Sequence, residues 1–302
     1  MELQALPEGC IAHILSYTTP VDVCSLSLIS KAFCSAAESD SLWDRFLPSD
    51  LVSIISESSS SLLATSSSKK ALYLALSDHP IIIDHGTKSF QLERKSGKKC
   101  YMLSARDLSI IWGDTPEYWN WITLPGSRFE EVAELVQVCW FEIRGKINAH
   151  ELSSDTNYAA FLVFKMIDAS GFHYCPVECS VGTFGGRGCT KNVCLDPNLE
   201  ETQLDARFKG LQRPSVRSDG WLEIEMGEFF NSGVEDEEVE MSVKETESNW
   251  WKHGFYLQGI EVRPKLSVHK HNDPIIGVGP SYRPRRVLQK WGDKLKNIWN
   301  RG

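Results

Sequence analysis

The pattern of hydrophobic and polar residues predicts helices at the start of the chain. In residues 1 to about 48, Ile11, Ile14 and Leu15 follow the i, i+3, i+4 spacing of one helical face. The sequence Thr-Pro-Val-Asp predicts a second helix, with Thr19 as N-cap, Pro at the first helical position and Asp22 completing a capping box. Further apolar residues complete a three-helix unit: Val23, Leu26, Leu28, Phe33, Leu42, Trp43 and Phe46. A unit this small cannot bury all of these side chains, so we expect part of its apolar surface to meet a partner.

A serine-rich segment, residues 56–70, is typical of a flexible linker, and KKALYLAL at 69–76 then predicts a short helix. From about residue 88 to residue 266, apolar and polar residues alternate as in strands. The clearest runs are VCWFEIRGKI at 138–147, YAAFLVFKMI at 158–167, WLEIEM at 221–226 and GFYLQGIEV at 254–262. Separated by Gly, Pro and Asp, these strands predict an antiparallel β-sandwich or barrel.

Three segments follow other patterns. SRFEEVAELVQ, residues 127–137, predicts a short helix or turn, and VEDEEVEMSVKETE, residues 234–247, predicts a charged loop between two strands. The tail, residues 270–302, is first rich in Pro and Gly and then predicts a helix with a basic outer face. Its apolar face comprises Val287, Leu288, Trp291, Leu295, Ile298 and Trp299. The pattern leaves the partner of this helix open: the sandwich, another protein or an anionic membrane surface.

Composition narrows the class of protein. The chain has 302 residues, 42% of them hydrophobic, and a net charge of −8, which argues against general nucleic-acid binding. The N-terminus has no secretory signal pattern, and no apolar run is long enough to span a membrane. Nine cysteines, an odd number, and the absence of an N-x-S/T sequon favour free thiols in the cytosol or nucleus.

The first stretch resembles a known motif. LPEGCIAHILSYTTPVDVCSLSLISKAFCSAAESDSLWDRFLP resembles the F-box motif in its Leu6-Pro7 opening, its Pro-Val-Asp-Val turn and its closing tryptophan. F-box domains bind the Skp-type adaptor of cullin–RING ubiquitin ligases through an apolar helical face, and the resemblance implies the same here. The implied adaptor contacts are Leu6, Pro7, Ile11, Ile14, Leu15, Pro20, Val23, Leu26, Leu28 and Trp43.

Residues 69 to about 265 resemble the plant phloem-lectin family, also called Nictaba-type lectins. The resemblance lies in KKALYLALSDHPIIIDHGTKSFQLERKSGKKCYMLSARDLSIIWGDTPEYWNW, in SRFEEVAELVQVCWFEIRGKI and in WLEIEMGEFFN. It implies a sandwich of jelly-roll type that binds N-acetylglucosamine oligomers and N-glycan cores. Two tryptophans seven residues apart mark the family's sugar site, and these are Trp112 and Trp119 here.

The segment IIWGDTPEYWNW, residues 110–121, accordingly predicts an aromatic carbohydrate site. An indole face is flat and apolar and can stack on the C–H face of a pyranose. We expect Trp112 and Trp119 to form an exposed wall, with Asp114, Glu117 or Asn120 binding hydroxyl and acetamido groups. The alternative is that these tryptophans belong to the core, as we expect of Trp121 and Trp140.

Two signals of catalysis or metal binding are weak. Glu223 and Glu225 lie two apart on one strand and share a face, whereas a glycosidase pair faces across a cleft; a nearby third carboxylate is Glu228. The spacing of His173, Cys175, Cys179, Cys189 and Cys194 is untypical of zinc sites. We therefore expect no metal, no cofactor and no catalytic residues.

These interpretations predict an α+β protein: F-box 1–48, serine-rich linker 49–68, lectin-like all-β sandwich 69–266 and irregular tail 267–302. The predicted function is substrate recognition for a cullin-based ubiquitin ligase, with a glycan or glycoprotein as target. One alternative is an F-box protein whose sandwich binds protein without carbohydrate. Others are a carbohydrate-binding stress protein acting without the ligase, and a hydrolase on the same scaffold.

Overall fold

The computed structural model describes residues 6–56, 58, 66–183, 188–199, 206–234 and 237–265. Its N-terminal part is helical, with α1 (Glu8–Leu15), α2 (Pro20–Leu26), α3 (Lys31–Ala36) and α4 (Asp40–Trp43). The predicted capping box is confirmed, because the Thr19 hydroxyl accepts from the Asp22 N–H at 3.3 Å and the Asp22 carboxylate accepts from the Thr19 N–H at 3.3 Å. The predicted tail helix lies outside the described residues.

Among the described residues, two further helices follow this part in the sequence before the first strand. The predicted linker 49–68 is wrong at its start, where helix α5 (Leu51–Ser56) buries Leu51, Ile54 and Ile55. Serine content had concealed these three apolar residues. Helix α7 (Lys69–Asp78) forms where the apolar run predicted it, capped by Ser68, and its Tyr73 ring packs 5.1 Å from the Trp43 ring.

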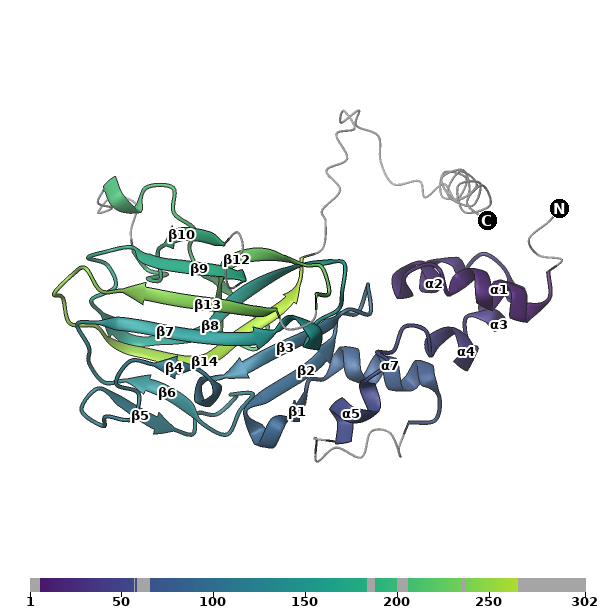
Figure 1. Cartoon of the computed structure of the whole chain (residues 1–302), viewed down its shortest axis with the longest axis horizontal. Coiled ribbons are helices and arrows are strands. Elements are labelled where there is room, and N and C mark those ends of the chain that lie inside the picture. The colour runs from purple at the N-terminus through teal and green to yellow at the C-terminus, as the bar shows by residue number, and fades with distance from the viewer. Residues whose placement is uncertain are drawn as a thin grey trace. The chain divides into compact units, whose positions relative to one another are not determined.

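The remaining described chain forms two antiparallel sheets (Figure 1), which confirms the predicted fold class. Seven strands of the nine-stranded sheet run in the order β1 (Ile81–Ile83), β2 (Lys88–Leu92), β3 (Lys99–Ser104), β14 (His253–Pro264), β8 (Thr156–Ser170), β12 (Leu222–Asn231) and β11 (Ser215–Val216). The other two branch from this order, because β6 (Val132–Leu135) also pairs with β14, and β5 (Trp119–Ile122) pairs with β6. The five-stranded sheet runs β10 (Cys189–Val193), β9 (Val177–Thr183), β13 (Glu238–Glu245), β7 (Phe141–Asn148) and β4 (Ser109–Ile110).

An aromatic cluster fills the space between the sheets. The Phe141 ring of β7 lies 5.2 Å from the Phe255 ring of β14, and Phe164 of β8 stacks on Phe255 at 5.0 Å. All three are fully buried. Buried aromatic pairs of this kind contribute beyond the area that they bury, so they fix how the sheets pack.

Two predicted non-strand segments are strands in the structure. The segment expected to be a helix or turn, 127–137, contains β6, and the expected charged loop 234–247 contains β13. In β13 the residues Val239, Met241 and Val243 are buried between exposed or half-buried polar neighbours. The period-two signal was present but was hidden by the high density of glutamates.

The nine cysteines divide by position. All are described and unpaired; Cys10, Cys24 and Cys34 on the N-terminal helices are exposed, whereas Cys100 and Cys179 in the sheets are buried. Burial raises the pKa of Cys100, and it raises the pKa of Cys179 to about 12. Because the thiolate is the reactive form, we expect Cys100 and Cys179 to be unreactive in the folded protein.

We therefore expect a two-stage titration with a chromogenic disulfide reagent. The three exposed helix thiols should react at once in native protein, and all nine should react in denaturant without prior reduction. Fast native labelling of Cys100, identified by mass spectrometry, would contradict the packing described for β3.

Candidate functional site

Four loops meet at one end of the sandwich, at the left in Figure 1. Strand register brings them together, because Glu245 pairs with Phe141, Lys244 with Glu178, and His253 with Ser170. The loops are residues 111–118, 136–140, 171–176 and 246–252. Every exposed tryptophan of the described residues lies on them: Trp112, Trp140, Trp250 and Trp251.

The loop 111–118 crosses from β4 in one sheet to β5 in the other and presents Trp112. Its turns are closed by the Gly113 N–H, which donates to the Ile110 carbonyl at 3.0 Å, and by the Thr115 N–H, which donates to the Trp112 carbonyl at 2.9 Å. Trp112 has a φ of 58°, in the left-handed region. A bulky residue in this conformation costs free energy and is typical of sites where a side chain is held for a purpose.

Trp112 offers an open ring surface. Its side chain is 43% exposed, and its ring lies 5.0 Å from the Tyr118 ring at an interplanar angle of 36°. The predicted exposure of Trp112 is thus confirmed. Asp114 and Glu117 of the same loop are also exposed.

The expectation that Trp119 shares this wall is wrong. Trp119 is 2% exposed and stacks on Phe141 in the core, with ring centroids 6.3 Å apart. Its strand, β5, pairs with β6 and turns this side chain between the sheets. Of the two tryptophans that lie seven residues apart, Trp112 is therefore exposed and Trp119 belongs to the core.

The indoles of Trp119 and Trp121 hold the loop in place through hydrogen bonds to its backbone. The Trp119 indole N–H donates to the Ile111 carbonyl at 3.2 Å, and the Trp121 indole N–H donates to the Gly113 carbonyl at 3.0 Å. These two carbonyls flank Trp112 on both sides. Trp121, expected in the core, is only half-buried, and the Arg106 guanidinium lies 3.6 Å from its ring centroid.

Asn120, predicted to bind sugar hydroxyl or acetamido groups, already has a hydrogen-bond partner within the chain. The Asn120 amide donates to one Glu134 carboxylate oxygen at 3.3 Å, and the Tyr256 hydroxyl donates to the other at 3.0 Å. Trp140, also expected in the core, is 46% exposed, and its indole N–H donates to Glu142 at 2.9 Å. This bond and the Arg144 guanidinium lower the pKa of the Glu142 carboxyl despite its burial.

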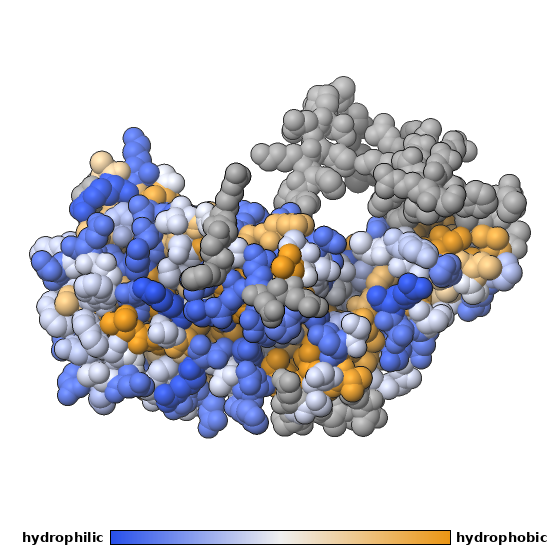
Figure 2. All heavy atoms as spheres, in the orientation of Figure 1, coloured by the Kyte–Doolittle hydropathy of each residue, from blue (hydrophilic) through white to orange (hydrophobic). Residues whose placement is uncertain are grey.

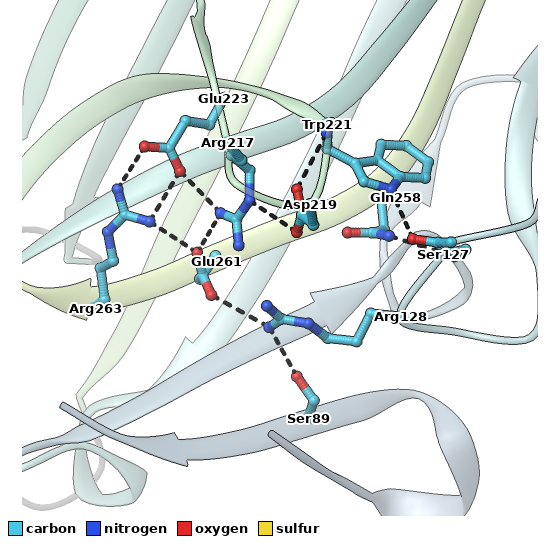
Figure 3. Close-up of polar contacts among 11 residues, drawn as sticks. Ser89, Ser127, Arg128, Arg217, Asp219, Trp221, Glu223, Gln258, Glu261 and Arg263 are labelled. Carbon is cyan, nitrogen blue, oxygen red and sulfur yellow. Dashed lines mark hydrogen bonds and ion pairs between the residues drawn. The ribbon is translucent and has the colours of Figure 1, made fainter. Parts of the chain in front are cut away.

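A charged cluster occupies the outer face of the nine-stranded sheet (Figure 3). The Glu261 carboxylate receives Arg217 at 2.6 Å, Arg263 at 2.9 Å and Arg128 at 3.2 Å. Burial alone would raise the pKa of Glu261, but the three guanidinium groups outweigh it and lower the pKa to about 2. Glu223 accepts from Arg217 and Arg263, and Asp219 from Arg217.

This cluster is a structural element. Three arginines face three carboxylates, so the charges balance, and the Trp221 indole N–H beside them donates to the Gly126 carbonyl at 3.0 Å. Trp221 packs with Met102, Phe129, Val132 and Val163 in a small core on this outer face. The cluster thus holds the segment 123–131 onto the sheet.

The carboxylates considered for a glycosidase pair are engaged by basic residues. Glu223 is held by arginines, Glu225 by Lys191 and Lys265, and Glu228 by Lys265, so the three carboxylates have structural partners. Among the described residues, no group of three or more His, Cys, Asp or Glu side chains could hold a metal ion. Within the same residues, no helix is long and apolar enough to cross a membrane.

The predicted adaptor contacts divide into buried and accessible residues. Several lie in the chain's own core and cannot meet a partner in this structure: Ile11, Leu15, Pro20, Val23, Leu26 and Trp43. Leu6 and Ile14 are half-buried, Pro7 is exposed and Leu28 is 84% exposed. Apolar atoms gather over the N-terminal helices in Figure 2, where Tyr17, Val21 and Ile29 are also exposed.

Comparison with known proteins accounts for both parts of the chain. Residues 98–264 match the family Phloem protein 2, and residues 3–49 match the family F-box-like. The F-box protein PP2-B10 of Arabidopsis thaliana is 45% identical over 86% of this chain and 93% of its own length. The putative F-box protein PP2-B12 of the same plant is 47% identical over 88% of this chain and 99% of its own length. Among solved structures, TmCBM61 in complex with β-1,4-galactotriose aligns over 52% of this chain and 87% of its own at 12% identity and a TM-score of 0.27, too low to support a conclusion.

Proposed function

The chain belongs to the F-box proteins with a phloem protein 2 domain, and from that premise we propose that it recognises glycosylated substrates for a cullin–RING ubiquitin ligase. F-box proteins are generally non-catalytic substrate adaptors, and the two families that match this chain indicate no catalytic activity. We also propose that the N-terminal helices bind a Skp-type adaptor and that the sandwich binds N-acetylglucosamine-type glycans. Action in the cytoplasm or nucleus belongs to the same proposal.

One observation supports the glycan site most directly, namely the exposed Trp112 held in a left-handed conformation. The buried indole of Trp119 and the half-buried indole of Trp121 fix the carbonyls on either side of it, so the ring is positioned before any ligand arrives. Preorganisation reduces the entropy lost on binding. A pyranose would stack its C–H face on this indole, while Asp114 and Glu117 offer carboxylates to its hydroxyl groups.

The site is open, so binding is expected to be weak. Affinities between micromolar and millimolar correspond to about −8 to −4 kcal/mol. Weak binding suffices when the F-box fixes the protein within the ligase, because the target is then held at a high effective concentration near the ubiquitin-loaded enzyme.

Trp112→Ala tests the glycan site. Loss of one stacked indole should weaken binding of an N-acetylglucosamine trimer about tenfold, since an aromatic contact contributes about 1–1.5 kcal/mol. The melting temperature should change little because the side chain is 43% exposed. Isothermal calorimetry and thermal melting on the full chain measure both quantities.

The matched control is Phe230→Ala. Phe230 is 55% exposed on β12 and pairs with Asn157, at the opposite end of the sandwich from the aromatic loops. Binding should be unaffected by this change. If the parent protein binds no glycan and instead captures its target as bare polypeptide, the sandwich is a protein-binding module.

Leu28→Asp tests the adaptor surface. Leu28 is 84% exposed among the apolar side chains of the N-terminal helices, and an aspartate there would have to be desolvated against the partner. Co-precipitation with a Skp-type adaptor should fall at least tenfold, while Val52→Asp, on the exposed side of α5, should leave it unchanged. If both variants co-precipitate the adaptor as well as the parent does, Leu28 is not part of the interface.

A further inference from the structure

A second set of aromatic rings lies at the same end of the sandwich, on the loops 171–176 and 246–252. The Tyr174 ring contacts those of His173 and Trp250, whose centroids are 4.0 Å and 4.1 Å away. Tyr174 and Trp250 are nearly parallel, at 17°, and Trp250 is 54% exposed. We call these three rings the Trp250 platform.

A buried ion pair holds the loop that carries Trp250. Lys252 pairs with Glu245, and their side chains are 1% and 3% exposed. The Lys252 ammonium also donates to the carbonyls of Trp250 at 3.1 Å and Cys139 at 3.0 Å, while Glu245 accepts from the Ser248 N–H at 2.8 Å. Burying two charges costs free energy, and here the buried pair holds a single surface loop. Such support is typical of side chains held for binding.

Close backbone contact joins the two loops. Gly171 has a φ of +92°, and a Cβ built on it would lie 2.3 Å from the Trp251 carbonyl oxygen. Only glycine allows this approach. The platform is therefore fixed from both loops.

A polar cavity of about 370 Å³ is lined by residues that neighbour the platform in sequence. Its lining includes Cys175, directly after Tyr174, and Glu247, three residues before Trp250. The lining offers an amide at Asn192, a hydroxyl at Thr246 and carboxylates at Glu178 and Glu247. Lys244 pairs with Glu178 at 2.9 Å across part of it. The lining thus supplies hydrogen-bond donors and acceptors within a few residues, along both loops, of the platform rings.

We propose that the Trp250 platform and this cavity form a second carbohydrate-binding site, separate from the Trp112 loop. A pyranose combines one C–H face with hydroxyl groups that donate and accept, and the platform beside the cavity offers the complement to both. An apolar peptide segment would leave the polar lining without hydrogen-bond partners, at a cost for each group. A quaternary ammonium ligand is bound by aromatic rings that surround it as a cage, whereas the Tyr174 and Trp250 rings stack nearly parallel to each other.

That the ligand is a sugar rests on the proposed function, whereas the location of the site does not. Two sites at one end of the sandwich would bind two branches of a glycan together and raise avidity without a deeper pocket. The chain would then favour branched or clustered glycans over short linear ones.

A glycan array on the full chain and its variants tests the proposal. The array carries N-acetylglucosamine oligomers, high-mannose N-glycans and galactose-terminated glycans, and the proteins are the parent, Trp250→Ala, Trp250→Tyr, Trp112→Ala and Phe230→Ala. Trp250→Ala should weaken a subset of signals at least about tenfold, with the strongest loss on branched glycans. Trp250→Tyr keeps a flat ring and should retain those signals within about threefold.

The outcomes separate the two sites. A Trp250→Ala profile identical to that of the parent and of Phe230→Ala would overturn the second site, as would equal losses in Trp250→Ala and Trp250→Tyr. Losses in Trp250→Ala together with a Trp112→Ala profile identical to that of the parent would support the second site while removing Trp112 from the proposed function. Thermal melting of each variant identifies any loss that is due to unfolding.

Discussion

Glu261→Gln is expected to lower the free energy of unfolding of the sandwich by about 3 kcal/mol at pH 7. The amide keeps the shape of the side chain but removes the charge that Arg128, Arg217 and Arg263 surround. The side chains of Arg128 and Arg217 are 15% and 12% exposed, so water cannot replace the lost carboxylate in full. Urea denaturation followed by tryptophan fluorescence measures the difference.

Acid should abolish this difference. The pKa of Glu261 is about 2 in the folded protein and near its ordinary value of 4.5 in the unfolded chain. Because the folded value is the lower one, the carboxylate stabilises the fold fully above about pH 4.5 and loses that effect as the pH falls toward 2. The parent and Glu261→Gln should therefore converge in stability over this range.

Glu240→Gln is the matched control for this charge. Glu240 pairs with Lys146 at 2.8 Å, but their side chains are 47% and 55% exposed, and exposed pairs contribute at most about 1 kcal/mol. An equal loss in the two variants would show that general charge balance, and not the buried cluster, stabilises the sandwich.

Trp119→Ala is expected to cost about 3–5 kcal/mol of stability, as for other large side chains removed from a core. The change removes the stack on Phe141 and the hydrogen bond to the Ile111 carbonyl. Thermal and urea unfolding should both show the loss, while Trp112→Ala should change stability by less than about 1 kcal/mol.

Trp119→Phe separates packing from positioning. The ring is retained, but the indole N–H that holds the Ile111 carbonyl is lost. We expect weaker glycan binding with a smaller loss of stability than for the alanine variant, and calorimetry on the same protein tests this. A Trp119→Ala protein that melts like the parent would contradict the buried position of this residue.

Local patterns predicted what depends on neighbours in sequence. Thr19 and Asp22 form a capping box because both partners lie within one helical turn. The alternation in β7 and β12 likewise identified strands, since one face of each is buried. The strand β13 escaped detection because glutamates on its outer face concealed Val239 and its buried companions.

The division of roles between Trp112 and Trp119 could not be read from spacing. Both are tryptophans in one short segment, and only the crossing of the chain from β4 to β5 turns one outward and the other between the sheets. The Trp250 platform was missed for a similar reason. Tyr174 and Trp250 are far apart in the sequence, and strand pairing alone brings their loops together.

The separation of Trp112 from Trp119 has a consequence for how such proteins diversify. The exposed ring, which we propose faces the ligand, contributes little to the fold, and the ring that supports the fold is buried in the core. Mutations at the exposed position therefore change recognition while the stability margin is preserved. Gene duplicates built on this scaffold can drift toward new ligands, or lose the old one, without first crossing a barrier of misfolding.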